Sequence, residues 1–104
     1  MIHNVYSIFD SATEMYMKTF QFITHNQAIR FFDDGCQNAE TDLARHPKDY
    51  ALYFVGRFDD NKGEFLPTDK VWLTDGTESL ARSRQVDGAQ LDLVDKVVNA
   101  DNME

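Results

Sequence analysis

The chain has 104 residues, a formal net charge of −8 and a hydrophobic fraction of 42%, which are the size and composition of one folded domain. This acidity counts against general phosphate binding, because non-specific nucleic-acid binders take most of their affinity from a basic surface. The single cysteine, Cys36, excludes an intramolecular disulfide bond and a cysteine-rich zinc site.

The N-terminal part of the chain predicts two strands. Residues 2–9 are rich in β-branched and aromatic side chains, and residues 10–11 follow them as a turn. Residues 15–23 form the second candidate strand, although residues 12–18 would also fit a turn of helix. Alternation along the second strand places four side chains on one side: Tyr16, Lys18, Phe20 and Phe22.

A central helix is predicted to begin after Thr24, because Thr24 and Gln27 have the spacing of a capping box. Gly35 costs such a helix roughly 1 kcal/mol relative to alanine, so we expect its C-terminal half to fray or bend. The helix must end before Pro47. Apolar residues at steps of three and four form one stripe along it: Ala28, Ile29, Phe32, Cys36, Ala39 and Leu43.

Residues 50–65 predict a β-hairpin. Residues 59–63 are of types that tolerate turns and left-handed φ, so the chain reverses there. Pro67 in the second strand indicates a bulge or an edge strand. Alternation in the first strand gives one face with Tyr50, Leu52, Phe54 and Phe58, and another with Ala51, Tyr53, Val55 and Arg57.

The remaining chain is polar and acidic. Residues 75–76 mark a turn, and residues 77–88 are polar with Gly88 as a breaker. We therefore expect a core domain over residues 1–74 and an extension over residues 75–104. A short C-terminal helix, docking on the domain or on a partner, is indicated by four apolar residues at helical spacing: Leu91, Val94, Val97 and Val98.

The order of the elements is thus ββαββ with a possible final helix. This order predicts an α+β fold, in which a small antiparallel sheet packs on one central helix. No apolar run approaches the ~20 residues that a membrane-spanning helix needs, so we expect a soluble, intracellular protein.

Catalytic and metal-binding patterns are weak. The acidic pairs at residues 33–34 and 59–60 are typical of solvated surface, and the loop at residues 59–64 lacks the alternating ligands of a calcium loop. Cys36 lies on the apolar stripe, where a free cysteine behaves as a small hydrophobe. We expect no enzyme, no metal and no cofactor. The three histidines lack metal-site spacing: His3, His25 and His46.

Aromatic and basic side chains form the remaining pattern. Single-stranded nucleic acid is bound by aromatic rings, on which bases stack, and by cations that attract the backbone. The alternative, which the residues by themselves favour, is that the phenylalanines are core and Lys18 is an exposed neighbour. The proposed contact face would consist of Tyr16, Lys18, Phe20, Arg30, Tyr53 and Arg57.

Three blocks in the same order carry a resemblance to a known family. They are residues 1–11, residues 27–32, and His46-Pro47-x-Asp49-Tyr50 followed by Gly56-x-Phe58-Asp59-Asp60 and Gly63. The chain resembles the small nonstructural protein of the Microviridae, tailless single-stranded-DNA phages, and especially of their gokushovirus branch. The resemblance covers about residues 1–66 and leaves residues 75–104 outside.

The resemblance implies a protein that is absent from the virion and encoded beside replication and capsid genes. Such proteins are commonly regarded as DNA-binding, or as assisting the switch from genome replication to single-strand packaging. No catalytic residue is carried over from the family. The resemblance also implies that the protein acts in the cytoplasm of the host cell.

Two functions of different classes follow. The first is a non-enzymatic single-stranded-DNA-binding accessory factor in genome replication or packaging, with homodimerisation adding phosphate contacts. The second is an acidic protein-interaction module that binds a phage replication or capsid protein, or a host factor. The charge of −8 favours the second function, and the family favours the first. A DNA-mimic inhibitor is a weaker third option.

Overall fold

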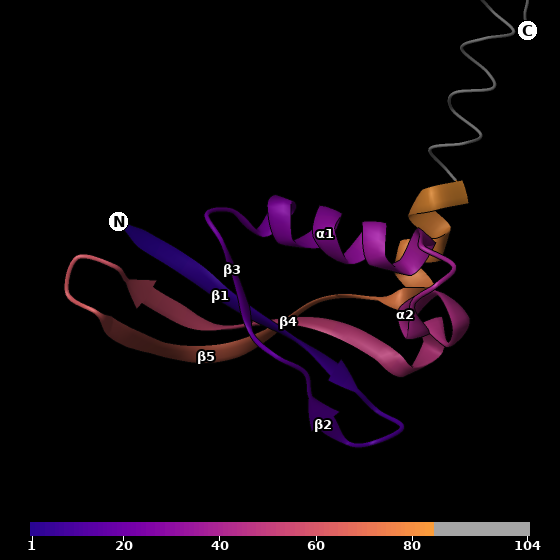
Figure 1. Cartoon of the computed structure of the whole chain (residues 1–104), viewed down its shortest axis with the longest axis horizontal. Coiled ribbons are helices and arrows are strands. Elements are labelled where there is room, and N and C mark those ends of the chain that lie inside the picture. Colours follow the sequence, from indigo (N-terminus) through magenta and orange to yellow (C-terminus); the bar gives the residue numbers. More distant parts are fainter. Residues whose placement is uncertain (85–104) are drawn as a thin grey trace, which may run out of the picture.

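Three long antiparallel strands form the centre of the fold in the computed structural model, which describes residues 1–84. They are β1 (Ile2–Asp10), β4 (Tyr50–Asp59) and β5 (Glu64–Asp75), with β4 between the other two (Figure 1). Along its other edge β1 pairs with two short strands, β2 (Met15–Tyr16) and β3 (Phe20–Phe22). The predicted α+β class with a small antiparallel sheet is confirmed.

The helices lie between β3 and β4 and after β5. The segment before β4 contains α1 (His25–Gln37), α2 (Asp42–Arg45) and the 3₁₀ turn η1 (Pro47–Asp49). Residues 76–84 are helical. In Figure 1, α1 lies on one side of the sheet and β2 lies towards the other. Among residues 1–84, no helix is both long and apolar enough to cross a membrane.

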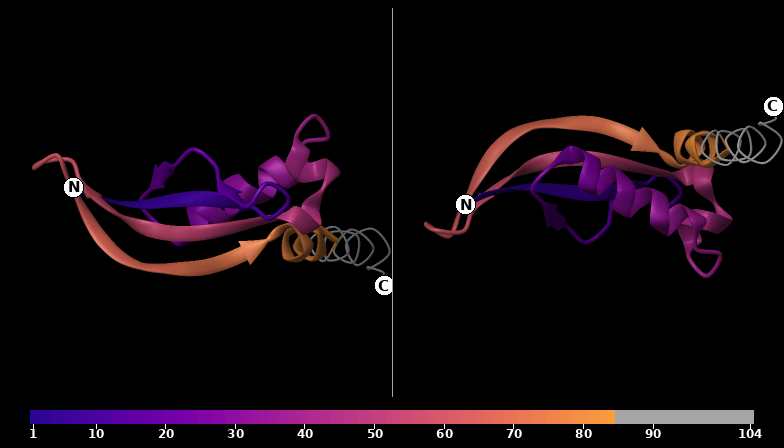
Figure 2. Two further views of the ribbon diagram at one scale, coloured as in Figure 1. Left: turned by 90° about the horizontal axis from the view of Figure 1, so that it is seen from below. Right: turned by 90° about the horizontal axis from the view of Figure 1, so that it is seen from above.

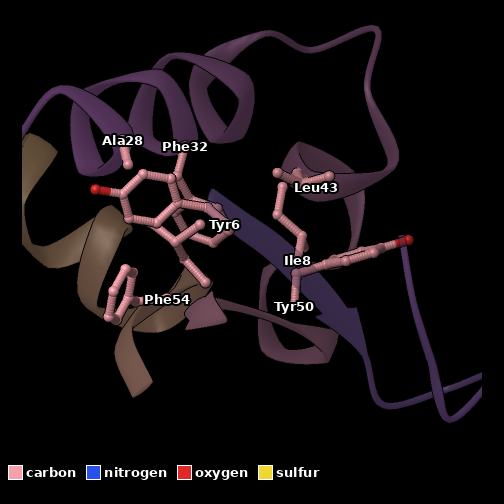
Figure 3. Packing of buried hydrophobic residues seen from close by; sticks show 8 residues of the cluster. Tyr6, Ile8, Ala28, Phe32, Leu43, Tyr50 and Phe54 are labelled. Carbon is pink, nitrogen blue, oxygen red and sulfur yellow. The ribbon is translucent and has the colours of Figure 1, made fainter. Parts of the chain in front are cut away.

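The hydrophobic core lies between the sheet and α1. Tyr6 is at its centre, with a fully buried ring in contact with Phe20, Phe54 and His25. Figure 3 shows how side chains from strands and helices meet there. Removing this apolar surface from water, at about 25 cal/mol per Å², is the main stabilising contribution. The buried cluster consists of Tyr6, Ile8, Ala28, Phe32, Leu43, Tyr50, Leu52 and Phe54.

The start of α1 agrees with the sequence, and the helix ends before Pro47 as predicted, but Ala39 and Leu43 of the predicted apolar stripe lie beyond its end. The side chain of Thr24 accepts a hydrogen bond from Gln27 N, and Gln27 Oε1 accepts one from Thr24 N, which completes the predicted capping box. The helix ends at Gln37, before the apolar stripe is complete. Leu43 reaches the core from α2 instead, whose first turn is capped by Thr41.

The expected second strand is divided into β2 and β3. Tyr16 pairs with Phe9, whereas Phe20 pairs with Tyr6, so three residues (17–19) lie opposite two residues of β1. One extra residue reverses the alternation of side chains. Tyr16 and Phe20 therefore lie on opposite faces of the sheet, and the prediction that they share one side is wrong.

A similar shift interrupts β4. Val5 pairs with Gly56 and Tyr6 pairs with Phe54, which leaves Val55 as an extra residue. The predicted alternation is confirmed up to this bulge and is wrong beyond it. Arg57 leaves the face of Tyr53, and its guanidinium carbon lies 5.9 Å from the centre of the Phe54 ring.

The strand β5 is an edge strand whose pairing with β4 is also irregular, as Pro67 predicts. Figure 2 shows that the β4–β5 hairpin bends and that its turn projects beyond the rest of the sheet. Gly63 in that turn has φ of 67°, the left-handed conformation that glycine adopts without strain. The predicted reversal at residues 59–63 is confirmed.

A turn at residues 75–76 was expected, but a helix begins there. Asp75 Oδ1 accepts a hydrogen bond from Glu78 N at 2.8 Å, as a helix N-cap does. Arg82 of this helix forms two hydrogen bonds to Asp33 of α1, at 2.6 and 3.0 Å. The predicted helix around residues 89–98 lies outside the described residues, and the division of the chain at residue 75 stays a prediction.

Candidate functional site

The face of the sheet opposite α1 carries a group of aromatic side chains around one lysine. Tyr6 and Ile8 of β1 point into the core, so Phe9 points to the opposite face, and its partner Tyr16 lies beside it. Tyr53 pairs with Trp72, and Lys70 stands two residues before Trp72 on β5. We call this set the tyrosine–lysine cluster: Phe9, Tyr16, Tyr53, Lys70 and Trp72.

Lys70 lies against both tyrosines. Its Nζ atom is 4.9 Å from the ring centre of Tyr16 and 5.0 Å from that of Tyr53, which are cation–π distances. Lys70 Nζ also donates a hydrogen bond to Tyr16 Oη. The two tyrosine ring centres are 5.7 Å apart, with the rings nearly perpendicular. Phe9 supports Tyr16, with ring centres 4.8 Å apart.

The cluster keeps a positive charge and open aromatic surface. The hydrogen bond to Tyr16 raises the pKa of Lys70 above its ordinary value, so the ammonium stays charged at neutral pH. Tyr16 is 40% exposed and Trp72 is 44% exposed. The cluster therefore offers rings for stacking and a cation for an anion at the same place.

Comparison with known proteins identifies the family. Residues 3–79 match the family described as Phage ORF5 protein. The chain belongs to this family. The Protein ORF5 of Chlamydia phage 1 is 34% identical over 73 residues, which cover 66% of this chain and 76% of that protein. No solved structure matches the chain.

Chlamydia phage 1 is a gokushovirus of the Microviridae, so the relation to this phage family that the sequence blocks predict is confirmed. The two descriptions name a phage protein without a ligand or an activity. The function of this family member must therefore be argued from its own residues.

Two of the six residues that the sequence predicts as contacts, Tyr16 and Tyr53, belong to the tyrosine–lysine cluster. Phe20 packs on the α1 side of the sheet, with its ring centre 5.8 Å from that of Tyr6. Arg57 lies over Phe54, and Arg30 is exposed on α1. A single face made of all six residues does not exist, because the two register shifts put Phe20 and Arg57 on the α1 side of the sheet and Arg30 lies on α1 itself.

Three members of the tyrosine–lysine cluster were missed by sequence reasoning: Phe9, Lys70 and Trp72. Lys70 and Trp72 are two residues apart, so alternation along a strand at residues 70–72 would have put them on one face. Which residues lie opposite them depends on the irregular pairing of β4 and β5, which the sequence does not reveal.

Asp60 and Cys36 have surroundings that indicate structural and not catalytic roles. The N-terminal ammonium and His3 Nε2 contact the carboxylate of Asp60 at 2.7 and 2.8 Å and lower its pKa. Burial raises the pKa of Cys36, which keeps its thiol neutral and weakly nucleophilic. Within residues 1–84, no group of three or more histidine, cysteine or acidic side chains is placed to hold a metal ion.

Proposed function

We propose that this phage protein is a non-enzymatic accessory factor that binds single-stranded DNA during replication or packaging of the viral genome in the host cytoplasm. The observation that carries the proposal is the contact of the Lys70 ammonium with the rings of both Tyr16 and Tyr53. Aromatic platforms with a neighbouring cation are what proteins use to bind single strands without reading their sequence.

In this proposal the bases stack on the exposed rings, while the Lys70 ammonium attracts the phosphate between them. Stacking on an aromatic side chain is worth about 1–3 kcal/mol per base. Bases in a duplex are paired and stacked on one another, so their faces are not available to the cluster. The protein should therefore prefer single-stranded over double-stranded DNA.

The charge of the chain sets the expected strength of binding. Residues 85–104 hold five carboxylate side chains against one lysine, and thus a net −4 of the total −8. Few cations are available to neutralise phosphates, so we expect weak binding with a small salt dependence of about 0.7 per phosphate contact. A homodimer would double the number of phosphate contacts, and we therefore propose that the protein binds DNA as a homodimer.

Titration of a fluorescently labelled oligothymidylate, followed by anisotropy at several salt concentrations, tests the proposal. Tyr53→Leu should weaken binding by about 1 kcal/mol or more, because it removes one stacking surface and retains apolar volume. Lys70→Gln should also weaken binding, and it should reduce the magnitude of the negative slope of log K against log salt by about 0.7, because one phosphate contact is lost.

Two matched controls lie in and next to the β4–β5 turn. Lys62→Gln removes an exposed lysine, and Phe65→Leu removes an exposed ring, neither of which belongs to the tyrosine–lysine cluster. Both controls should bind like the parent protein. Absence of binding at low salt, or equal losses in controls and cluster variants, would refute the proposal.

A second candidate function rests on the net charge of −8. An acidic protein-interaction module would bind a phage replication or capsid protein, or a host factor, through its negative surface. Deleting residues 86–104 should then abolish capture of a purified partner such as the phage replication initiator, while the fold persists. Single-stranded-DNA binding that survives this deletion would favour the first function.

A further inference from the structure

A groove lies on the α1 side of the sheet, between α1, α2 and residues 17–20. Its volume is about 700 Å³, in the range of sites that hold a small ligand. Lys18 and Asp34 are the charged residues that line it. Its walls are mainly apolar, with side chains from Ile8, Met17, Phe20, Phe31, Phe32 and Leu43.

Phe31 offers an open ring in this groove. It is 49% exposed, although it lies on the helix that covers the core. Its ring centre is 4.9 Å from that of Phe20 and 5.5 Å from that of Phe22. One part of the Phe31 ring thus packs against Phe20 and Phe22, and its exposed part is free to stack on a flat ligand.

Residues 17–19, which line the groove, connect it along the chain to Tyr16 of the tyrosine–lysine cluster at one edge of the sheet. The chain passes from Tyr16 on one face to Phe20 on the other through residues 17–19, with exposed Lys18 between them. This crossing is fixed to β1, since Met17 N donates to Ile8 O at 2.7 Å and Ser7 Oγ donates to Met17 O at 2.7 Å.

We infer that the groove is a second base-binding site for the same DNA strand, whose backbone crosses the sheet edge over Lys18. The inference rests on the proposed function and extends it from one face of the sheet to both. Bases enter the apolar groove and stack on Phe31, while a phosphate meets Lys18. The carboxylate of Asp34 repels phosphate, so the base and not the backbone lies on that side.

Only a single strand can follow the proposed route from the tyrosine–lysine cluster over Lys18 into the groove. A duplex has a persistence length of about 150 base pairs and cannot turn around the edge of one sheet. A short oligonucleotide would occupy the tyrosine–lysine cluster alone, whereas a longer one would reach the groove as well. The length of the ligand therefore separates the two sites.

The test compares the full-length protein and its variants with two oligothymidylates of about four and about twelve nucleotides, which lie within the footprints common for single-strand binders. Phe31→Leu should weaken binding of the longer oligonucleotide by about fivefold or more and leave the shorter one unaffected. Lys18→Gln should act in the same way, and Tyr53→Leu should weaken both. Phe65→Leu is the control for loss of an exposed ring.

Methyl signals of Ile8 and Leu43, followed by NMR in the unaltered chain, give a second readout that does not depend on the folding of a variant. They should shift with the longer oligonucleotide and not with the shorter one. Parent-like binding by Phe31→Leu with unmoved methyl signals would overturn the inference, while weakened binding by Tyr53→Leu would leave the proposed function standing.

Two further outcomes would also overturn the inference that the groove binds a base. If neither oligonucleotide binds the parent protein, the proposed function fails together with the groove. If the same methyl signals shift on removal of residues 85–104, and not on addition of DNA, the groove belongs to the chain's own C-terminal segment.

Discussion

Tyr6 contributes its ring to the hydrophobic core and its hydroxyl to a hydrogen bond at the edge of that core. Its ring is fully buried, and its hydroxyl forms a hydrogen bond of 2.8 Å with His25 Nδ1 at the start of α1. A phenylalanine would fill the same space without this contact. Burial raises the pKa of Tyr6, so the hydroxyl stays neutral in the core.

Tyr6→Phe should lower the free energy of unfolding by about 1 kcal/mol, because it removes a hydrogen bond that links β1 to α1. Urea denaturation followed by circular dichroism measures the loss. In a His25→Ala background the same substitution should cost much less, since the partner is already absent. An equal cost in both backgrounds would contradict this role of the hydroxyl.

Asp60 predicts a dependence of stability on pH. The N-terminal ammonium and His3 lower its pKa in the folded protein, so its stabilising contribution is present above the unfolded value of about 3.9. The contribution is lost as the pH falls through the lower, folded value. Asp60→Asn should therefore have a lower Tm than the parent at pH 7, and the two Tm values should converge as the pH falls through the lowered pKa of Asp60 in the folded protein. Asp69→Asn, at an exposed position of β5, is the control for removal of a surface carboxylate.

At the scale of elements, much of the fold follows from local sequence. Thr24 and Gln27 predict the start of α1, and the polar residues 59–63 predict the β4–β5 turn. The two single-residue shifts, at residues 17–19 and at Val55, leave no comparable signal in the sequence. They arise from the pairing of whole strands with β1, and they decide which face Phe20 and Arg57 occupy.

The start of the helix at residues 76–84 has two competing signals in the sequence. Asp75 and Glu78 have the spacing of a helix cap, yet Asp75-Gly76 also predicts a turn. The structure explains the glycine by close packing, since an added Cβ on Gly76 would lie 2.0 Å from the carbonyl oxygen of Pro47.

Gly76→Ala should destabilise the protein by about 2 kcal/mol or more, because backbone atoms of η1 must move to admit the methyl group. Gly63→Ala is the matched control, since nothing lies within 4 Å of the added Cβ and only the positive φ is unfavourable. Its cost should be about 1 kcal/mol. Thermal unfolding compares the two, and a smaller effect at Gly76 than at Gly63 would contradict the packing argument.

At the scale of the whole molecule, the sheet presents two aromatic surfaces on an acidic protein. The tyrosine–lysine cluster lies on one face and the Phe31 groove on the other, with Lys18 at the edge between them. The sequence predicts one contact face for DNA that includes Tyr16 and Tyr53, and the structure places the centres of these two rings 5.7 Å apart. Their contact with Lys70 required the tertiary fold, because Lys70 is 54 positions from Tyr16.

The most direct test uses Trp72, the single tryptophan of the chain, which lies beside Tyr53 in the proposed DNA-binding surface. Titration with oligothymidylate should quench its fluorescence to saturation as bases stack near it, and added salt should weaken the apparent affinity. Duplex DNA of the same length should quench less at equal concentration. Unchanged Trp72 fluorescence at low salt, or equal quenching by single-stranded and duplex DNA, would contradict the account.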